Sequence, residues 1–460
     1  MMQPENRGQR KVEYENSEKT GKTKKAQKVL GNGVLAARAT GIVVLLLLCT
    51  CLISACSKTA PGPEEWKSEL SINAYTEEGF YSSVGGVLSL QFPNINFTVI
   101  PTDHGESFQL PEQYDKLIEE TKPDIIVMDG IGVYERMSER GILYDLGALM
   151  KRDKFDTERV QPGMLQFLQQ KGQGKLLGLA ASFNSSALFF NQDLFERYRI
   201  PVPTDQMSWE EMLLLAAKFP VEEGAERIYG YSGNWGHFSN AIFSLAGTEK
   251  LSYFDENHEF QIDTEKWRKL FHLLVDSYKK GVIYKDWEDK FSEGHAAMTI
   301  YGPEYIRTLK DKGISFKWDI VTHPVNPANR DVSTVMSMNR IYGIHSGTTN
   351  LEAAWEVVKF LNGQEMAKLE TYSLPTHTSA LKERDGISLE PFSKLRMDVE
   401  EESVAENVPP SFYMTLINII NQEMEGVWKN EKSIEQVLQQ IQAKAQQALS
   451  VARMEQEQTG

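Results

Sequence analysis

The stretch PEQYDKLIEETKPDIIVMD, residues 111–129, decides the fold class, because a helix-like segment runs directly into a short β-rich segment. Two more β-rich segments precede it, LSINAY at residues 70–75 and NFTVI at residues 96–100. Strands that alternate with helices along a chain are typical of a mainly parallel sheet with helices on its faces. The sequence therefore predicts an α/β protein.

Later helices are marked by apolar stripes at helical spacing. Ser208 and Glu211 form a capping box, the reciprocal pairing that begins a helix. The stripes are Trp209, Met212, Leu213 and Ala216; Trp267, Leu270, Phe271, Leu274, Val275 and Tyr278; and Leu351, Ala354, Trp355 and Val358, which follow Asn350 as a candidate N-cap. Apolar residues at this period form the buried face of a helix, so we assign these tryptophans to the core.

The cysteines lie together near the amino terminus, at Cys49, Cys51 and Cys56, and none follows. A disulfide scaffold needs cysteines spread through the fold, and a metal site needs partners at ligand spacing. A basic leader precedes the uncharged run GIVVLLLLCTCLISAC, residues 41–56. This order is typical of a secretory signal, and the apolar run is shorter than the roughly 20 residues of a membrane-spanning helix.

Ile53, Ser54, Ala55 and Cys56 resemble a bacterial lipobox, in which an aliphatic and two small residues precede the modified cysteine. In such signals the chain is cut before the cysteine, whose thiol carries a diacylglycerol. We therefore expect residues 1–55 to be a signal peptide with a long basic leader. Residues 56–68 are then the lipidated cysteine and a flexible tether. The alternative is an uncleaved signal anchor.

The charge of the remaining chain limits its partners. The whole sequence has a net charge of −15, and residues 1–40 carry nine Lys/Arg against four Asp/Glu. Without the leader the chain keeps 40 basic and 60 acidic residues, a net charge of −20. Nucleic-acid binding depends on clustered Lys and Arg, so this composition argues against it. Attachment to a membrane would depend on the acyl chains.

Chain length predicts two lobes, because single cores stop growing near roughly 250–300 residues. Several segments, taken in order, resemble the family 1 extracellular solute-binding proteins, which are the maltose-binding-like receptors of ABC importers. The segments are 92–100 (FPNINFTVI), 122–129 (KPDIIVMD), 139–150 (ERGILYDLGALM), 174–219 with its Phe190-Asn191-Gln192-Asp193 motif, 291–305 (FSEGHAAMTIYGPEY), 353–369 and 374–381. One departure is Glu304, which follows Gly-Pro where the family usually has tryptophan.

The resemblance implies a two-lobed type II periplasmic-binding-protein fold, with solute held in a cleft between lobes. Lobe 1 would comprise residues 69–181 and 303–349, and lobe 2 residues 186–298 and 350–450, leaving a polar tail at 451–460. Residues 180–186 (AASFNSS) and 299–303 (TIYGP) would be the hinge strands that absorb backbone rotation.

A sugar needs flat aromatic surfaces for its ring and polar side chains for its hydroxyls, at loops that follow the strands. The candidate ligand-binding residues are Tyr75, Glu78, Asp129, Phe183, Asn184, Trp235, Tyr301, Glu304, Asn339 and Tyr342, with Thr376 and His377 as further candidates. The same aromatic residues could instead pack between lobes, and the acids could be solvated or salt-bridged.

The sequence contains no motif that would indicate an enzyme or a metal receptor. The chain has no Gly-x-Ser-x-Gly elbow, His-Glu-x-x-His helix or glycine-rich phosphate loop. Its acids are too numerous to identify a glycosidase pair. The histidines are scattered, and DENHEF at residues 255–260 is the one local cluster, which could hold calcium or be an exposed turn.

We expect a monomeric, lipid-anchored receptor at the extracellular face of a bacterial cytoplasmic membrane. It would capture a mono- or oligosaccharide and deliver it unaltered to the membrane subunits of an ABC permease, with no cofactor, metal or nucleic acid. Two alternatives stay open, a sensory lipoprotein and a receptor for a metal or another small molecule.

Overall fold

The computed structural model describes residues 68–102, 111–221, 224, 227–233, 235–399 and 408–459. These residues all belong to one compact unit. The predicted signal peptide, Cys56 and nearly all of the tether lie outside them. Among the helices of the described residues, none is long and apolar enough to cross a membrane.

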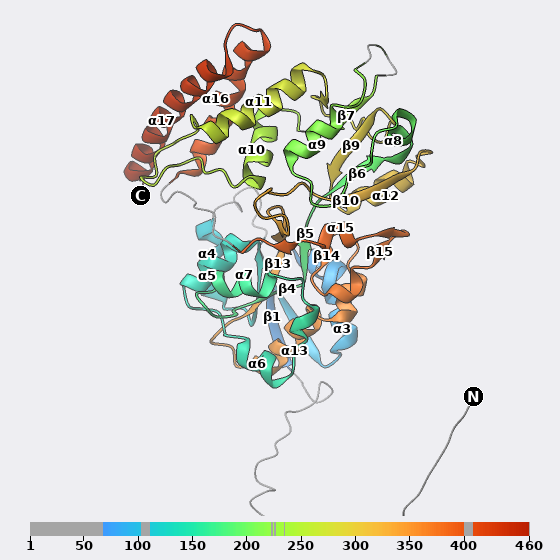
Figure 1. The fold of residues 1–460 in the computed structure, drawn as a ribbon. Helices are drawn as coiled ribbons and strands as arrows, with labels where there is room; N and C mark the ends of the chain where they lie inside the picture. Colours follow the sequence, from blue (N-terminus) through green and yellow to red (C-terminus); the bar gives the residue numbers. More distant parts are fainter. Residues whose placement is uncertain are drawn as a thin grey trace, which may run out of the picture. The chain divides into compact units, whose positions relative to one another are not determined.

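The first sheet has five strands in the order β2-β1-β3-β13-β4 (Figure 1). Its strands are β1 (Ser68–Ala74), β2 (Ile95–Pro101), β3 (Ile125–Asp129), β4 (Leu179–Ala180) and β13 (Arg340–Ile344). The three predicted β-rich segments are confirmed as β1, β2 and β3, which run parallel. β13 is antiparallel to both of its neighbours, so the sheet is mixed.

Helices and turns accompany this sheet, and we call the sheet with these elements the first lobe. They are α2 (Glu77–Phe80), the π-turn Tyr81–Gly85, α3 (Gly86–Gln91), α4 (Pro111–Thr121), α5 (Ile131–Glu139), α6 (Gly147–Arg152), the 3₁₀ turn Thr157–Arg159, α7 (Met164–Lys171), α13 (Leu351–Leu361) and α14 (Gln364–Leu369). Trp355 of α13 is fully buried against Leu70 and Ile72 of β1, and its indole N–H donates to Asp153 at 2.6 Å. The interpretation of this tryptophan as core is confirmed.

The second sheet has the order β10-β6-β9-β7-β8, and we call it, with its helices, the second lobe. Its strands are β6 (Ala187–Asn191), β7 (Tyr229–Ser232), β8 (Ile283–Tyr284), β9 (Ala296–Tyr301) and β10 (Trp318–Thr322), and its helices are α8 (Gln192–Tyr198), α9 (Trp209–Ala216), α10 (Phe238–Thr248), α11 (Glu265–Lys279), α12 (Glu304–Asp311), α16 (Pro410–Trp428) and α17 (Ile434–Thr459). Figure 1 shows α16 and α17 side by side. Because α17 continues to Thr459, the expected polar tail is the end of a helix.

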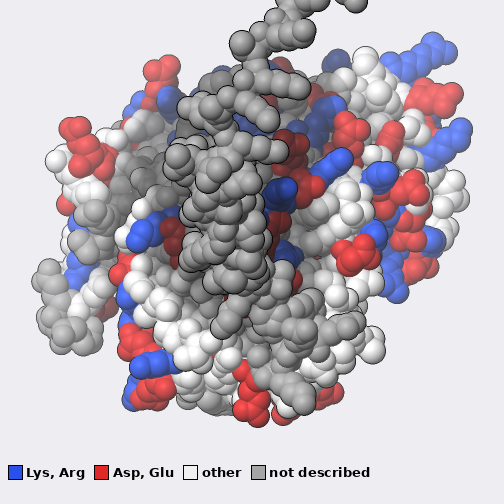
Figure 2. All heavy atoms as spheres, turned by 90° about the horizontal axis from the view of Figure 1, so that it is seen from below, with Lys and Arg blue, Asp and Glu red and all other residues white. Residues whose placement is uncertain are grey.

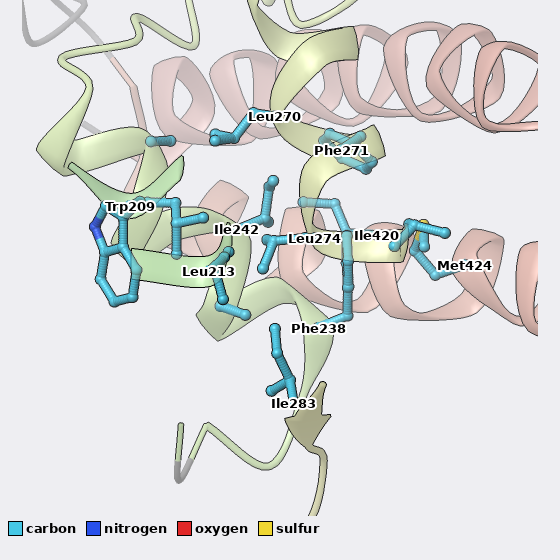
Figure 3. Packing of buried hydrophobic residues seen from close by; sticks show 14 of the residues in the cluster. Trp209, Leu213, Phe238, Ile242, Leu270, Phe271, Leu274, Ile283, Ile420 and Met424 are labelled. Carbon is cyan, nitrogen blue, oxygen red and sulfur yellow. The ribbon is translucent and has the colours of Figure 1, made fainter. Parts of the chain in front are cut away.

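The core of the second lobe is built from the stripes read in the sequence. Figure 3 shows Trp209 and Leu213 of α9 with Leu270, Phe271 and Leu274 of α11, all of which are buried. The capping box at the start of α9 is also confirmed. Ser208 Oγ accepts from the Glu211 amide at 3.2 Å, and Glu211 Oε2 accepts from the Ser208 amide at 2.8 Å.

Three short strands link the two lobes. They are β5 (Ser182–Asn184), β12 (Ser337–Met338) and β14 (Leu374–Pro375), which form a small sheet in the order β12-β5-β14. β5 lies between β4 and β6 in sequence, β12 between β10 and β13, and β14 between α14 and α16. The chain therefore passes between the lobes three times, and each pass contributes one strand to this crossing sheet.

The remaining short elements lie before the second pass and after the third. They are β11 (Val332–Ser333) with β17 (Arg396–Met397), β15 (Glu383–Arg384) with β16 (Ile387–Ser388), the 3₁₀ turn Thr378–Ala380 and α15 (Glu390–Ser393).

The passes differ from the expected hinges and boundaries. Residues 180–186 do contain a crossing strand, β5, but residues 299–303 end strand β9 of the second sheet and lead into α12. β10 lies in the segment expected in lobe 1, yet it pairs with β6 of the second sheet. Conversely α13 was expected in lobe 2, and it packs on the first sheet. Local patterns identify a strand or helix, whereas the sheet that it joins depends on distant pairing.

Charged side chains of both signs share the surface. On the face seen in Figure 2, Lys and Arg are interspersed with Asp and Glu. Arg152, for example, lies 2.7 Å from Glu352 and 2.7 Å from Asp153. Local pairing therefore accounts for much of the basic charge that this acidic protein carries.

Candidate functional site

The candidate site is a cavity of about 470 Å³ in the first lobe, where β1 and β3 end. Open α/β sheets hold their ligands beyond the carboxyl ends of their strands, so the position is the expected one. The lining residues include Asn73, Ala74, Tyr75, Thr102, Tyr114, Asp129, Arg136, Arg340 and Tyr342. Three of the predicted ligand-binding residues, Tyr75, Asp129 and Tyr342, are thus brought together around one cavity.

Asn73 bridges β1 and β3 at the edge of the cavity. β1 and β3 pair at Ile72 and Ile125, and one residue later the buried Asn73 side chain takes over the bridging. Its Oδ1 accepts from the Val127 amide at 2.8 Å, and its Nδ2 donates to the Val127 carbonyl at 2.9 Å. Asn73 and the two residues that follow it line the cavity together with Val127 and Asp129.

Asp129 and Arg340 give the cavity its polar character. They are opposite neighbours in the antiparallel pairing of β3 with β13. Burial raises the pKa of Asp129, and the nearby Arg340 opposes that increase. A carboxylate accepts hydrogen bonds from hydroxyls, and a guanidinium donates them. This pair therefore supplies both a hydrogen-bond acceptor and a hydrogen-bond donor for the hydroxyl groups of a solute.

Aromatic residues supply the apolar part of the wall. Tyr75 follows β1 directly and is 59% exposed, so its ring is accessible. Tyr114 is fixed instead, because its hydroxyl donates to the Val127 carbonyl at 2.8 Å, and burial raises its pKa well above 10. Tyr342 is buried in the sheet and contributes a wall. Tyr75 is thus the aromatic ring of the cavity best placed to stack on a solute.

Other predicted residues of the first lobe and the crossing sheet lie elsewhere. Glu78 is exposed on α2, outside the cavity lining. Phe183 is fully buried in the core. Asn184 and Asn339 bind each other, with amide contacts of 2.6 and 3.0 Å, and Asn339 Nδ2 also donates to Ser373 Oγ at 3.2 Å. These amides join β5, the end of β12 and the start of β14, so their contacts hold the crossing sheet together.

Trp235 does not border the first-lobe cavity. Its ring packs against Trp209 and Tyr231, with centroids 5.7 and 5.3 Å away, and it is partly buried. It also lies directly over Gly233, where a Cβ atom would be 2.5 Å from the ring. A glycine is therefore required beneath this half-buried tryptophan, and its contact with a solute stays a prediction.

Tyr301 and Glu304 also lie outside the cavity lining. Tyr301 is stacked on Tyr305 with centroids 3.8 Å apart. Glu304 lines a different, charged pocket with Arg307 and Arg384. The further candidates are buried, with Thr376 Oγ1 donating to the Ala180 carbonyl at 2.6 Å and His377 next to Ser379.

The sequence reading missed Asn73, Tyr114 and Arg340. Asn73 carried a signal, because a polar residue inside the β-rich segment LSINAY has to find hydrogen-bond partners if it is buried. Arg340 begins β13 and lies opposite Asp129, and that pairing is visible only in three dimensions. Residues after strands can be read from the sequence, but residues that shape the sheet between strands cannot.

Metal-binding geometry is not found among the described residues, in which no three His, Cys, Asp or Glu side chains come together. In the DENHEF segment, Asp255 Oδ1 accepts from the amides of Asn257 and Glu259 at 2.9 and 3.0 Å. These hydrogen bonds use the carboxylate to fix a turn.

Two sheets linked by three crossing strands define a two-lobed protein of the type II periplasmic-binding class. Solved structures of that class are similar to this chain. A sugar transporter of Rhizobium etli in an open conformation has a TM-score of 0.61 at 16% identity, covering 82% of this chain and 98% of that one. The sugar-binding protein MalE of Xanthomonas citri has a TM-score of 0.57 at 17% identity, covering 85% and 100%. Maltose-bound MalE3 of Thermotoga maritima has a TM-score of 0.51 at 17% identity, covering 82% and 99%. At these identities the likeness shows the fold.

The chain belongs to the bacterial extracellular solute-binding protein family, whose model matches residues 74–368. Among curated relatives, the galactooligosaccharide-binding protein of Bacillus subtilis (strain 168) is 24% identical over 268 residues, covering 55% of this chain and 60% of that protein. Three proteins of Brucella strains are 25% identical over 197 residues, covering 41% of this chain and 47% of each. The chain thus spans about half the length of the curated relatives that it matches.

Proposed function

We propose that this protein is the lipid-anchored receptor of an ABC importer, at the extracellular face of a bacterial cytoplasmic membrane, and that it captures a carbohydrate. The observation that carries the proposal is the first-lobe cavity, in which the accessible ring of Tyr75 lies with the Asp129 carboxylate and Arg340. An aromatic face with hydrogen-bonding groups of both kinds suits a sugar ring. The names of relatives agree, since one is a galactooligosaccharide-binding protein and one solved structure holds maltose.

Capture requires only binding energy, and no bond is broken. A ligand shifts an equilibrium between open and closed lobes by the contacts that it makes better in the closed form. The crossing strands β5, β12 and β14 are short element-terminal segments of the kind that act as hinges. The closed form would present the loaded receptor to the permease, which would take up the sugar unaltered.

Thermal unfolding of the purified protein against a panel of mono- and oligosaccharides tests the sugar assignment. At 100 times its dissociation constant, a one-site ligand stabilises the folded state by about 2.7 kcal/mol. We expect at least one sugar to stabilise the folded state in this way. The Tyr75→Ala substitution should abolish most of that stabilisation. Tyr372→Ala, which removes another exposed tyrosine, is the matched control. If only metals or peptides raise the midpoint, the carbohydrate assignment is wrong.

The membrane anchor rests on the lipobox-like residues 53–56 alone. Cys56→Ala should move the protein from the membrane fraction to the soluble one. A variant that stays in membranes and still incorporates labelled fatty acid would disprove lipidation at this cysteine.

A further inference from the structure

A second groove, of about 740 Å³, lies in the second lobe and shares no lining residue with the first-lobe cavity. Its volume falls within the roughly 300–1,000 Å³ of small-molecule sites. The walls come from the start of α10, the end of α11, β8 with the segment after it, and α16. Gly236 and His237 line it too, so the glycine-broken loop next to Trp235 contributes to this groove.

Helix α16 contributes both to the core and to the groove. Leu416, Ile420, Met424 and Val427 form its buried stripe, and Figure 3 shows Ile420 and Met424 within the core. The α16 residues that line the groove are Ile417, Asn418, Asn421, Gln422, Met424, Glu425 and Trp428, of which Met424 also belongs to the buried stripe. A polar face is usual on the side of a helix that does not meet the core, so the accessible tryptophan beside the amides is the distinctive feature.

Trp428 is a fixed and accessible aromatic surface. It is 38% exposed, and its ring makes edge contacts with Phe238 at 5.6 Å and Tyr278 at 5.9 Å between centroids. Phe238 is itself buried in the core. These contacts set the orientation of the indole before any ligand arrives, so little side-chain entropy is lost on binding.

The side-chain amides near Trp428 have donors and acceptors that the described residues do not use. Asn421 Oδ1 accepts from the Ser239 amide at 3.2 Å, which fixes this side chain at the base of the groove. Asn418 and Gln422 make no hydrogen bond with another of the described residues, and both are exposed. Amide side chains both donate and accept, as hydroxyl groups do.

The charges of the groove balance. Lys279 and Lys285 line it together with Asp286 and Glu425. Two of the four are already engaged, since Lys279 donates to Asn430 at 2.7 Å and Glu425 pairs with Lys429 at 3.1 Å. A balanced wall favours a neutral ligand over an anion or a cation.

We propose that this groove is a second carbohydrate site, in which Trp428 stacks on a sugar ring and Asn418, Asn421 and Gln422 bind its hydroxyls. The inference rests on the proposed function and deepens it by naming neutral oligosaccharides as the ligand class. An α-helix of a partner protein is the rival occupant, since Ile283, Ile417 and Met424 also line the groove. The exposed amides of Asn418 and Gln422 favour the hydroxyl groups of a sugar over the apolar face of such a helix.

Titration calorimetry of the full chain with maltotriose and β-1,4-galactotriose, and with glucose and galactose, tests the proposal. Removal of a stacking aromatic at the centre of a site costs on the order of tenfold in affinity or more. We expect Trp428→Ala to weaken trisaccharide binding by about tenfold, and to change the affinity for monosaccharides by less than about twofold. Because Trp428→Ala also removes core contacts, the paired Asn418→Ala and Gln422→Ala variant, both at exposed positions, should weaken the trisaccharide in the same way.

The controls separate this site from the first-lobe cavity. Tyr372→Ala should leave every affinity unchanged. In a Tyr75→Ala background, the trisaccharide binding that remains should depend on Trp428. If a sugar binds but the groove variants leave all affinities unchanged, the groove proposal is wrong and the proposed function stands. If no sugar binds the wild-type protein, both fall. If the groove variants reduce uptake in cells without changing sugar affinity, the occupant is a protein partner and the carbohydrate site is refuted.

Discussion

Asp129 is the residue on which the chemistry of the first-lobe cavity depends. It ends β3 and lies opposite Arg340 in the sheet. Burial raises its pKa above the ordinary value of 3.8, and Arg340 only partly offsets this effect. Its ionised form accepts hydroxyl hydrogen bonds, and its protonated form accepts fewer. Binding should therefore respond to pH at this one position.

We expect sugar affinity to fall as the pH decreases through the raised pKa of Asp129, starting above the range in which an exposed aspartate would protonate. Asp129→Asn should bind more weakly at neutral pH and should lose this part of the pH dependence. Calorimetric titrations between pH 7 and pH 4 give both curves. Parallel pH profiles for the two proteins would show that Asp129 does not contact the solute.

Single residues also show how far the sequence could be read. Tyr75 and Asp129 could be predicted because each directly follows a β-rich segment. Trp235 was predicted from its flanking glycines, and its half-buried ring lies over Gly233, outside the first-lobe cavity. Asn73 and Arg340 act across strands, so their partners, Val127 and Asp129, could not be identified without the pairing of β1, β3 and β13.

At the scale of elements, helix α9 begins with a capping box that is recognisable in the sequence and present in the structure. Its capping box was predicted and is confirmed. Glu211 has a second partner that the sequence did not reveal, Arg330, whose guanidinium lies 2.8 Å from its carboxylate. Hydrogen bonds from Arg330 and from the Ser208 amide hold the pKa of Glu211 at about 2. One carboxylate thus caps a helix and joins it to the loop after β10.

Loss of the Ser208 cap should lower the free energy of unfolding modestly. Ser208→Ala removes the side-chain acceptor for the Glu211 amide, and such substitutions destabilise a protein by about 1 kcal/mol. Ser208→Asp, which keeps an acceptor at the N-cap, should be close to wild type. Urea unfolding measures both, and equal stability of Ser208→Ala and wild type would mean that the cap does not contribute.

The second predicted helix cap, Asn350, does not bind the helix with its side chain. Asn350 does precede α13, but its side chain donates to the Glu69 carbonyl at 3.1 Å and does not cap the helix. Tertiary contact with the start of β1 determines its conformation. Sequence spacing therefore located the start of the helix but not the role of the residue there.

For the whole molecule, the sequence predicted two lobes and the crossing at residues 180–186. It did not predict β12 or β14, because strands of two residues have too little pattern to be recognised. The crossing sheet brings one strand from each pass together, and the Asn184–Asn339–Ser373 contacts join them. The passage between lobes is thus a single three-stranded element, and this element is where opening and closing would be absorbed.

A crystal structure of the protein with the sugar that stabilises it most tests the central claim directly. Our account predicts an intact sugar in the first-lobe cavity, with a ring against Tyr75 and a hydroxyl on the Asp129 carboxylate. Density for a cleaved sugar, or for a sugar bound away from Tyr75 and Asp129 while this cavity stays empty, would contradict it.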